Sequence, residues 1–346
     1  MTDERVDSAV QVTIGRAMHP RRGPHNPVST TPERRANSVR RTTTHDSIRV
    51  PDPLGPLHMI ACGRDLVTRA DLATDVVSEA EVDVMIDYIP NRLVSQIVSS
   101  PPLAGIETLV GVSASSGFRR AVTDIAPDLR QQHALRFQLL DDVPTAALVS
   151  GYAVAASGVE MPPPPPGSMK RNEDLCAGWA AGATIMIDVD KGLRPPLVTG
   201  PVVASMANAH DTLAWHDFGA LPPHSMRRAR RIDAWRDGDV TRIDSFFRDS
   251  YFDVDGIETV IHEYTIAAKV DVASMTFTSC AASIGALPWM ECPSAAASAE
   301  RLVGAPVVGL RDWVRETFVG TTTCTHLNDT LRALEDVDVL IGALAS

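Results

Sequence analysis

The last third of the chain shows two kinds of pattern, first one typical of strands and then one typical of helices. The first part is rich in β-branched and aromatic residues and is interrupted by a hairpin-type turn, Asp237-Gly238-Asp239. We predict strands at 230–236, 240–251, 257–270 and 275–284. After Pro293 the composition becomes helical, and leucines recur at helical spacing. We predict helices at 295–303, 310–318 and 327–337. Strands followed by helices indicate an α+β fold, in which helices pack on one face of an antiparallel sheet.

Short motifs from the first half of the chain return in the same order in the second half, displaced by about 190 residues. The matched pairs are SVRR at 38–41 and SMRR at 225–228, RD at 64–65 and 248–249, ETLVG at 107–111 and ERLVG at 300–304, and LDD at 140–142 and LND at 327–329. Ordered matches at a nearly constant offset predict two homologous pseudo-repeats, 33–155 and 218–346, each with this α+β fold. Asp142 and Asp329 occur in both copies, so we interpret them as structural, as helix caps.

Two segments outside the copies have compositions unlike a folded core. Residues 1–32 are rich in Arg, Pro, Ser and Thr, which predicts a flexible N-terminal tail. Residues 156–217 include five consecutive prolines at 162–166, which favour an extended polyproline helix. We therefore predict that 156–217 is a Pro-rich spacer and connecting segment.

The net charge and the cysteine content exclude several classes of protein. A formal charge of −11 disfavours binding to nucleic acid or to an anionic membrane. Five cysteines, an odd number in a chain of 346 residues, do not form a disulfide framework. No apolar run reaches the roughly 18 residues of a membrane helix, and the acidic start is unlike a signal peptide. We expect a cytoplasmic protein with no nucleic-acid or membrane partner; the sequence carries no signal for its oligomeric state.

Three residues with metal-binding or nucleophilic chemistry occur in the second copy only. Where the first copy has Ser100, Phe137 and Leu139, the second has Cys292, Cys324 and His326. Two thiolates and an imidazole supply three of the four ligands of a zinc or iron site, with one position open. The same residues also fit a Cys292 thiolate with His326 as its base. A third interpretation is that the cysteines are simply small buried hydrophobic residues.

The third predicted strand carries the motif His262-Glu263-Tyr264. Alternation along a strand places His262 on one face of the sheet and Glu263 on the other. Both are candidate catalytic residues as general bases, and His262 or Asp249 is a candidate fourth metal ligand. The alternative is that they are solvated or hydrogen-bonded strand residues. The histidine-rich stretch 210–224 fits no metal-ligand spacing and is considered only as the rim of a site.

Four arginines within 227–231 form a basic group in an otherwise acidic protein. Arg227 and Arg228 are candidates for binding a phosphate-bearing ligand such as a coenzyme A thioester. The alternative is that these arginines pair with the nearby aspartates. The sequence has no P-loop, no strand-placed G-x-G-x-x-G, no G-x-S-x-G and no H-E-x-x-H, which disfavours the enzyme classes with those motifs.

Four motifs of the second copy resemble a bacterial family, Domain of Unknown Function 2889. They are MRR at 226–228, HEY at 262–264, LPWMECP at 287–293 and CTHLND at 324–329. The resemblance implies a bacterial protein. It also implies a role in the breakdown of aromatic compounds or steroids, because genes of such proteins are associated with those pathways.

The order of strands, Cys292, a small-residue helix and Cys324 is similar to that of the U-type iron–sulfur cluster scaffold proteins. Those proteins use three cysteines around such a core, and Cys292 and Cys324 match two of them in order. Asp249 or Asp253 stands where the third cysteine would precede the strands. The resemblance implies a metal site on the same core.

Together these features predict a cytosolic catabolic enzyme with a single Cys/His site in the second copy. Its chemistry would be hydrolysis or lyase chemistry, metal-assisted or thiolate-based, on a carbonyl or acyl-thioester substrate of small size. The alternative is a non-catalytic protein that binds a metal ion or an iron–sulfur cluster.

Overall fold

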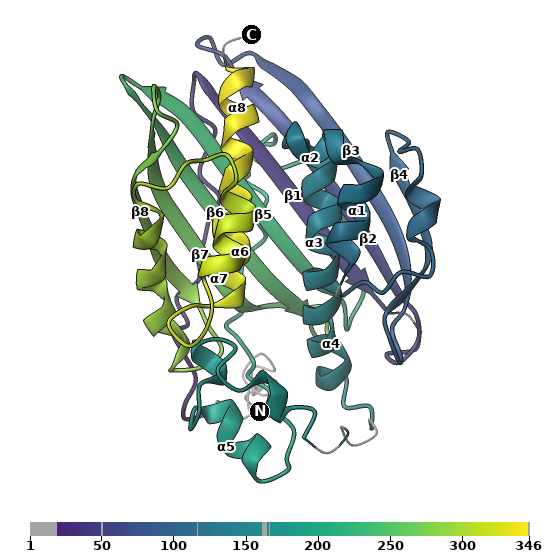
Figure 1. Cartoon of the computed structure of the whole chain (residues 1–346). Helices are drawn as coiled ribbons and strands as arrows, with labels where there is room; N and C mark the ends of the chain where they lie inside the picture. The colour runs from purple at the N-terminus through teal and green to yellow at the C-terminus, as the bar shows by residue number, and fades with distance from the viewer. Residues whose placement is uncertain (1–18, 50, 116, 161–164, 166, 345–346) are drawn as a thin grey trace, which may run out of the picture.

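One antiparallel sheet of eight strands extends through the whole molecule (Figure 1). The computed structural model describes residues 19–49, 51–115, 117–160, 165 and 167–344. In spatial order the strands are β4 (Leu93–Ser100), β3 (Thr74–Asp87), β2 (Leu57–Thr68), β1 (Ser38–Ile48), β5 (Met226–Asp237), β6 (Val240–Phe252), β7 (Glu258–Asp271) and β8 (Phe277–Ala286). The four strands predicted for the second half are confirmed as β5 to β8.

Helices cover one face of this sheet, and each half of the chain supplies those above its own strands (Figure 1). The first half contributes η2 (Ile106–Leu109), α1 (Phe118–Ile125), α2 (Pro127–Gln131), α3 (Leu135–Val149) and α4 (Gly151–Ala156). The second half contributes η5 (Cys292–Leu302), α6 (Leu310–Thr317), α7 (Thr325–Arg332), η6 (Ala333–Asp336) and α8 (Val337–Ala343). A fold of antiparallel strands with helices on one face is therefore confirmed. The helix predicted at 295–303 is the 3₁₀ helix η5. Descent of the halves from a duplication stays a prediction.

The segments predicted to be a tail and a spacer pack onto the sheet where the structure describes them. Residues 1–18, 161–164 and 166 lie outside the described residues. Most of the proline run at 162–166 is among them, so its predicted polyproline helix stays a prediction. In the described part of the tail, the Val28 amide donates to a Glu263 carboxylate oxygen at 2.5 Å. Residues 167–217 form η3 (Lys170–Asn172), η4 (Ala177–Trp179) and α5 (Thr184–Asp190), and bury Cys176 and Trp215. The connecting segment therefore contributes to the core.

The two central strands are buried although their sequences are polar. Strand β1 reads SVRRTTTHDSI, and ten of its eleven residues are buried. Helices cover one face of β1 and β5, and the irregular segment 199–224 covers the other, where Trp215 lies buried with Phe246. Because no face of these strands is left to solvent, the alternation of polar and apolar residues typical of a half-exposed strand is absent.

A layer of buried ion pairs joins the helices of the two halves above β1 and β5. Asp336 of η6 lies 2.8 Å from Arg41 of β1 and 2.5 Å from Arg311 of α6. Further buried pairs are Arg41–Asp65, Arg228–Asp249, Arg230–Asp142, Arg311–Asp141 and Arg332–Asp141. Asp142 lies inside α3 and Asp329 inside α7, so neither is the helix cap that the sequence predicted. Asp142 pairs instead with Arg230, and Asp329 with Arg332. Removing one partner of such a pair leaves an uncompensated buried charge.

The buried carboxylates make the free energy of unfolding depend on pH in the acidic range. Burial alone would raise the pKa of Asp141, but Arg332, Arg119 and Arg311 outweigh burial and lower it to about 2. Arg230 likewise holds the pKa of Asp142 below its usual range. A carboxyl whose pKa is lower in the folded state contributes stability above its unfolded value of about 4, and that stability is lost as the pH falls through the folded value. We expect the free energy of unfolding to fall between about pH 4 and pH 2. Urea unfolding across that range checks this, and an unchanged value at pH 2 would contradict it.

Candidate functional site

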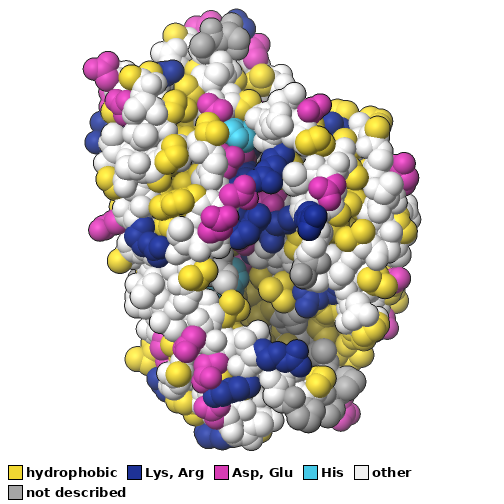
Figure 2. Space-filling view, viewed as in Figure 1, with side chains coloured by type: hydrophobic (Ala, Val, Ile, Leu, Met, Phe, Trp, Pro, Cys, Tyr) yellow, Lys and Arg dark blue, Asp and Glu magenta, His cyan; other side chains and the backbone are white. Residues whose placement is uncertain are grey.

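A cavity of 570 Å³ lies between the two sets of helices, at the end of the sheet nearest α4 and α5. Figure 2 shows a hollow with hydrophobic side chains on this face, next to a band of basic and acidic side chains. Its walls come from α3, α4, the segment 172–198, β7, η5 and α7. Most of the lining is apolar, and it includes Leu148, Leu175, Trp179, Ile185, Leu197 and Trp289. Such a space suits a small apolar molecule.

Two imidazoles on one wall of the cavity and a buried carboxylate beside them lie close together, and we call them the Asp–His group: His262, His326 and Asp249. Their ligand atoms all lie within 4.8 Å of one another. His262 Nδ1 is 3.5 Å and His326 Nε2 is 3.9 Å from the same Asp249 oxygen. The two imidazole rings are stacked, with centroids 3.6 Å apart. In the described part of the chain, these three side chains are close enough together to share a metal ion.

Strand register and a helix start place these three side chains. Asp249 on β6 lies directly opposite Arg228 on β5 and His262 on β7, so the three occupy one row across the sheet. Arg228 donates to both carboxylate oxygens of Asp249, at 2.9 and 3.0 Å. His326 comes from the first turn of α7, which lies above this row. An ionised carboxylate has about four lone-pair positions, so Asp249 retains acceptor capacity beside Arg228.

The electrostatics favour a charged carboxylate and a neutral imidazole. Burial alone would raise the pKa of Asp249, but Arg228 outweighs burial and keeps this pKa well below its usual range. Burial, helped by His262, lowers the pKa of His326 well below its ordinary value. At neutral pH the His326 imidazole is therefore neutral, and this form has the free lone pair that binds a metal ion or accepts a proton.

The predicted cysteines line the cavity but are not part of the Asp–His group. Cys324 is the N-cap residue of α7, and its Sγ lies 3.9 Å from His326 Nδ1. Cys292 begins η5 and also lines the cavity, close enough to Cys324 for the charge of one thiolate to raise the pKa of the other thiol. Burial raises the pKa of Cys324 to about 11 and that of Cys292 further, so both thiols are protonated at neutral pH. Of the predicted trio, the structure brings together Cys324 and His326.

The other predicted site residues are held in ion pairs. Glu263 lies on the opposite face of β7 from His262, fully buried, and pairs with Arg248 at 2.7 Å. Arg228 is engaged with Asp249, and Arg227 with Asp46 at 2.7 Å. These contacts follow the salt-bridge interpretation of the arginines. Neither Arg227 nor Arg228 lines the cavity, so neither is placed to bind a phosphate group there.

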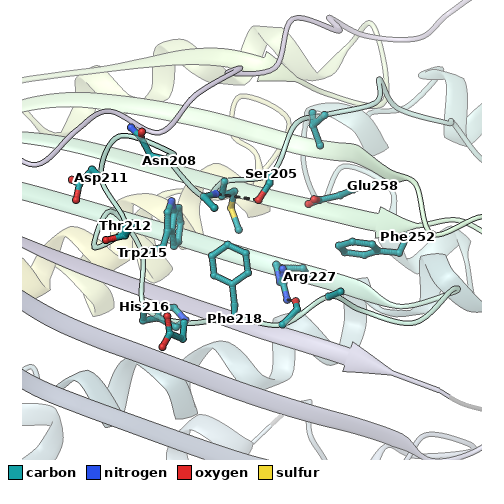
Figure 3. Close-up of a pocket in the computed structure, with 17 residues that line it drawn as sticks. Ser205, Asn208, Asp211, Thr212, Trp215, His216, Phe218, Arg227, Phe252 and Glu258 are labelled. Carbon is teal, nitrogen blue, oxygen red and sulfur yellow. Dashed lines mark hydrogen bonds between the residues drawn. The ribbon is translucent and has the colours of Figure 1, made fainter.

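Arg227 borders a second hollow, of 600 Å³, on the face of the sheet opposite the helices (Figure 3). Its labelled lining includes Trp215, Phe218, Phe252 and Glu258. His216, in the histidine-rich stretch, contacts Thr42 at 2.9 Å and Thr44 at 3.0 Å. Burial lowers the pKa of His216 to about 3, so it is a neutral, hydrogen-bonded residue of the fold. The polar side chains that line this second hollow are largely engaged by other residues of the protein: Arg227 by Asp46, Asp211 by Arg34, His216 by Thr42 and Glu258 by Ser250.

Two features of the cavity were missed from the sequence. Cys176 and Trp179 line it, but they belong to the segment predicted as a spacer. Arg119 of α1 also lines it, although it belongs to the first half and the site was predicted in the second copy. A short-range signal was present for the first two, because they stand in an apolar stretch, LCAGWAAGATIMI at 175–187, that is unlike a spacer.

Residues 226–340 match the model of a family described as "Protein of unknown function (DUF2889)". The match contains all members of the Asp–His group and both predicted cysteines, and it agrees with the resemblance found in the motifs. No curated protein and no solved structure matches the chain, so the resemblance to iron–sulfur scaffold proteins has no support. Among the helices that the structure describes, none is long and apolar enough to cross a membrane.

Proposed function

We propose that the chain is an enzyme whose active site is the 570 Å³ cavity, with a zinc or iron ion held by Asp249, His262 and His326. The observation that carries the proposal is the convergence of the three ligand atoms within 4.8 Å, with both imidazoles on the wall of an apolar cavity. Two imidazoles and one carboxylate form a donor set that zinc and non-haem iron both accept, with open positions for substrate or water. His326 is retained from the predicted metal site, and the carboxylate and His262 replace the two thiols.

The surroundings point to the substrate class. Trp179 and Trp289 face a largely apolar space, so the bulk of the substrate would be apolar and of modest size. A metal ion there supplies a Lewis acid for a carbonyl oxygen, or lowers the pKa of a bound water. Hydrolysis or lyase chemistry on a carbonyl or acyl compound, in a cytoplasmic catabolic role, agrees with these features.

A second candidate function is metal-free catalysis by Cys324. It is favoured by the row Cys324, His326 and Asp249, in which each neighbouring pair is 3.9 Å apart. Such a row matches a thiol nucleophile, its base and the group that orients the base. The pKa of about 11 for Cys324 works against it, because the thiolate is the reactive form. For this reason we rank it behind the metal site.

We also propose that the two halves descend from a duplication and that one of them lost, or never gained, the site. Arg40 pairs with Asp233 across β1 and β5, and Arg227 pairs with Asp46 across the same strands, which is the same contact with the halves exchanged. Asp65 is opposite Ser78 beside a bulge, as Asp249 is opposite His262 beside a bulge. Where the second half has His262 and His326, the first half therefore has Ser78 and Leu139.

The proposal is tested by metal analysis and turnover on the same preparations. We expect one zinc or iron ion per chain, and turnover of aryl esters or acyl thioesters that a chelator abolishes and the metal restores. The variant His326→Leu, which copies the first half, should lose both. Stoichiometric metal without turnover would favour the non-catalytic metal-binding alternative. Turnover that persists without metal and is blocked by a thiol reagent would favour Cys324.

A further inference from the structure

A small pocket rich in arginine adjoins the cavity. This pocket, which we call the arginine pocket, has a volume of 230 Å³ and lies between α1, α2 and α6. Five arginines line it together with two aspartates, one threonine and one phenylalanine: Arg119, Arg120, Arg130, Arg311, Arg315, Asp124, Asp141, Thr123 and Phe137. Figure 2 shows basic side chains gathered in the hollow between the two sets of helices.

The five arginines that line the pocket outnumber its two aspartates, and one of them, Arg311, also pairs with the buried Asp336 behind the lining. Asp141 is shared among Arg119 at 3.0 Å, Arg311 at 3.3 Å and Arg332 from outside the lining. Asp312, at the edge, contacts both Arg130 and Arg315. Each of these two carboxylates therefore forms ion pairs with two or more guanidinium groups.

Two of these arginines have a donor group without a close partner, and a third lies near other positive charges. Arg311 is buried, and its Nε has no hydrogen-bond partner among the described residues. Arg120 reaches Asp124 only at 3.9 Å, and both side chains are largely exposed. Burial lowers the pKa of Arg315, and the positive charges of Arg332 and Arg119 lower it further, against the opposing effect of Asp141 and Asp312. An anion entering the pocket would relieve this excess positive charge.

The pocket and the cavity share one residue. Arg119 lines both, so a ligand group held in the arginine pocket would lie next to the entrance of the apolar space. Guanidinium groups bind phosphate oxygens in pairs, through a planar fork of N–H donors. An anionic group bound here would leave the apolar part of the same molecule directed toward the Asp–His group.

We propose that the arginine pocket binds the phosphate groups of an acyl substrate, whose acyl part occupies the 570 Å³ cavity. The proposal rests on the cavity being the substrate site, as proposed above, and it narrows the substrate to acyl compounds on a phosphate-bearing carrier. This proposal replaces the phosphate contacts expected at Arg227 and Arg228 by contacts with arginines of α1, α2 and α6.

Calorimetric titration of the full chain with pyrophosphate at low salt tests the anion site. We expect one site per chain whose affinity falls as salt rises. The variant Arg120→Gln/Arg315→Gln should bind at least tenfold more weakly, and these side chains are 88% and 47% exposed, so the fold tolerates the change. The matched control is Arg69→Gln, an exposed arginine paired with Asp75 elsewhere on the sheet, which should bind as the wild type does. No binding, or an equal loss in the control, would overturn the proposal.

Two more arms separate this proposal from the metal site. His326→Leu lacks a metal ligand but should bind pyrophosphate normally, so failure of the metal proposal does not produce failure here. An aromatic acyl coenzyme A should compete with pyrophosphate and change the fluorescence of the tryptophans that line the cavity, Trp179 and Trp289. Pyrophosphate binding without such competition would show a site for free phosphate and would overturn the link to the substrate.

Discussion

Replacing His262 by serine should weaken zinc binding by more than 100-fold. Mutations of residues that only support a metal ligand typically cost about 10–100-fold in affinity, and His262 is proposed as a ligand itself. Serine is the residue that the first half carries at the corresponding point, opposite Asp65, so the change suits the local strand geometry. Competition with a chromophoric chelator measures the affinity.

The matched control for this prediction is Cys292→Ser. Cys292 lines the same cavity and was a predicted ligand, but it lies outside the Asp–His group. We expect its zinc affinity to stay within about threefold of the wild type, with some loss of stability because a buried hydroxyl needs a partner. The opposite ranking, with Cys292→Ser losing zinc and His262→Ser keeping it, would restore the thiolate site.

Replacing Asp336 by alanine should lower the free energy of unfolding by about 3–5 kcal/mol. Asp336 is fully buried and pairs with Arg41 and Arg311, which come from two different halves of the molecule. Its removal leaves two buried guanidinium groups with less compensation. Urea unfolding of the wild type and the variant measures the difference.

The matched control lies two residues further along the chain. Asp338 is 44% exposed and approaches His133 at 3.4 Å. His133 is buried and pairs more closely with Glu335, at 2.9 Å, so it keeps a carboxylate partner when the partly exposed Asp338 is removed. Asp338→Ala should therefore cost less than about 1 kcal/mol. Equal costs for the two variants would mean that the charged layer between the halves does not stabilise the fold.

The strands of the second half were predictable because each shows β-branched residues or a hairpin turn within a short window. The central position of β1 and β5 was not, since Arg41 and Arg228 look like solvated charges when only neighbouring residues are considered. Their partners, Asp65, Asp249 and Asp336, are brought to them by strand pairing and by helices far along the chain. Only the assembled fold shows that these arginines are buried.

The candidate site was predicted in part for a similar reason. Comparison of the two copies drew attention to His326, and alternation along a strand placed His262 on the face opposite Glu263. Neither of these sequence comparisons shows how the strands pair. The pairing register of β6 and β7 is what places Asp249 opposite His262. Cys292 and Cys324 were chosen for their ligand chemistry, but burial keeps both thiols protonated, and only Cys324 contacts His326.

X-ray absorption at the zinc edge of the zinc-loaded full chain tests the central claim most directly. Zinc bound by Asp249, His262 and His326 should show only nitrogen and oxygen neighbours, at about 2.0–2.2 Å. The imidazoles should add the outer-shell scattering of their rings, and His326→Leu should abolish the bound zinc. A shell of sulfur at about 2.3 Å would instead place the ion on the cysteines and would contradict the account.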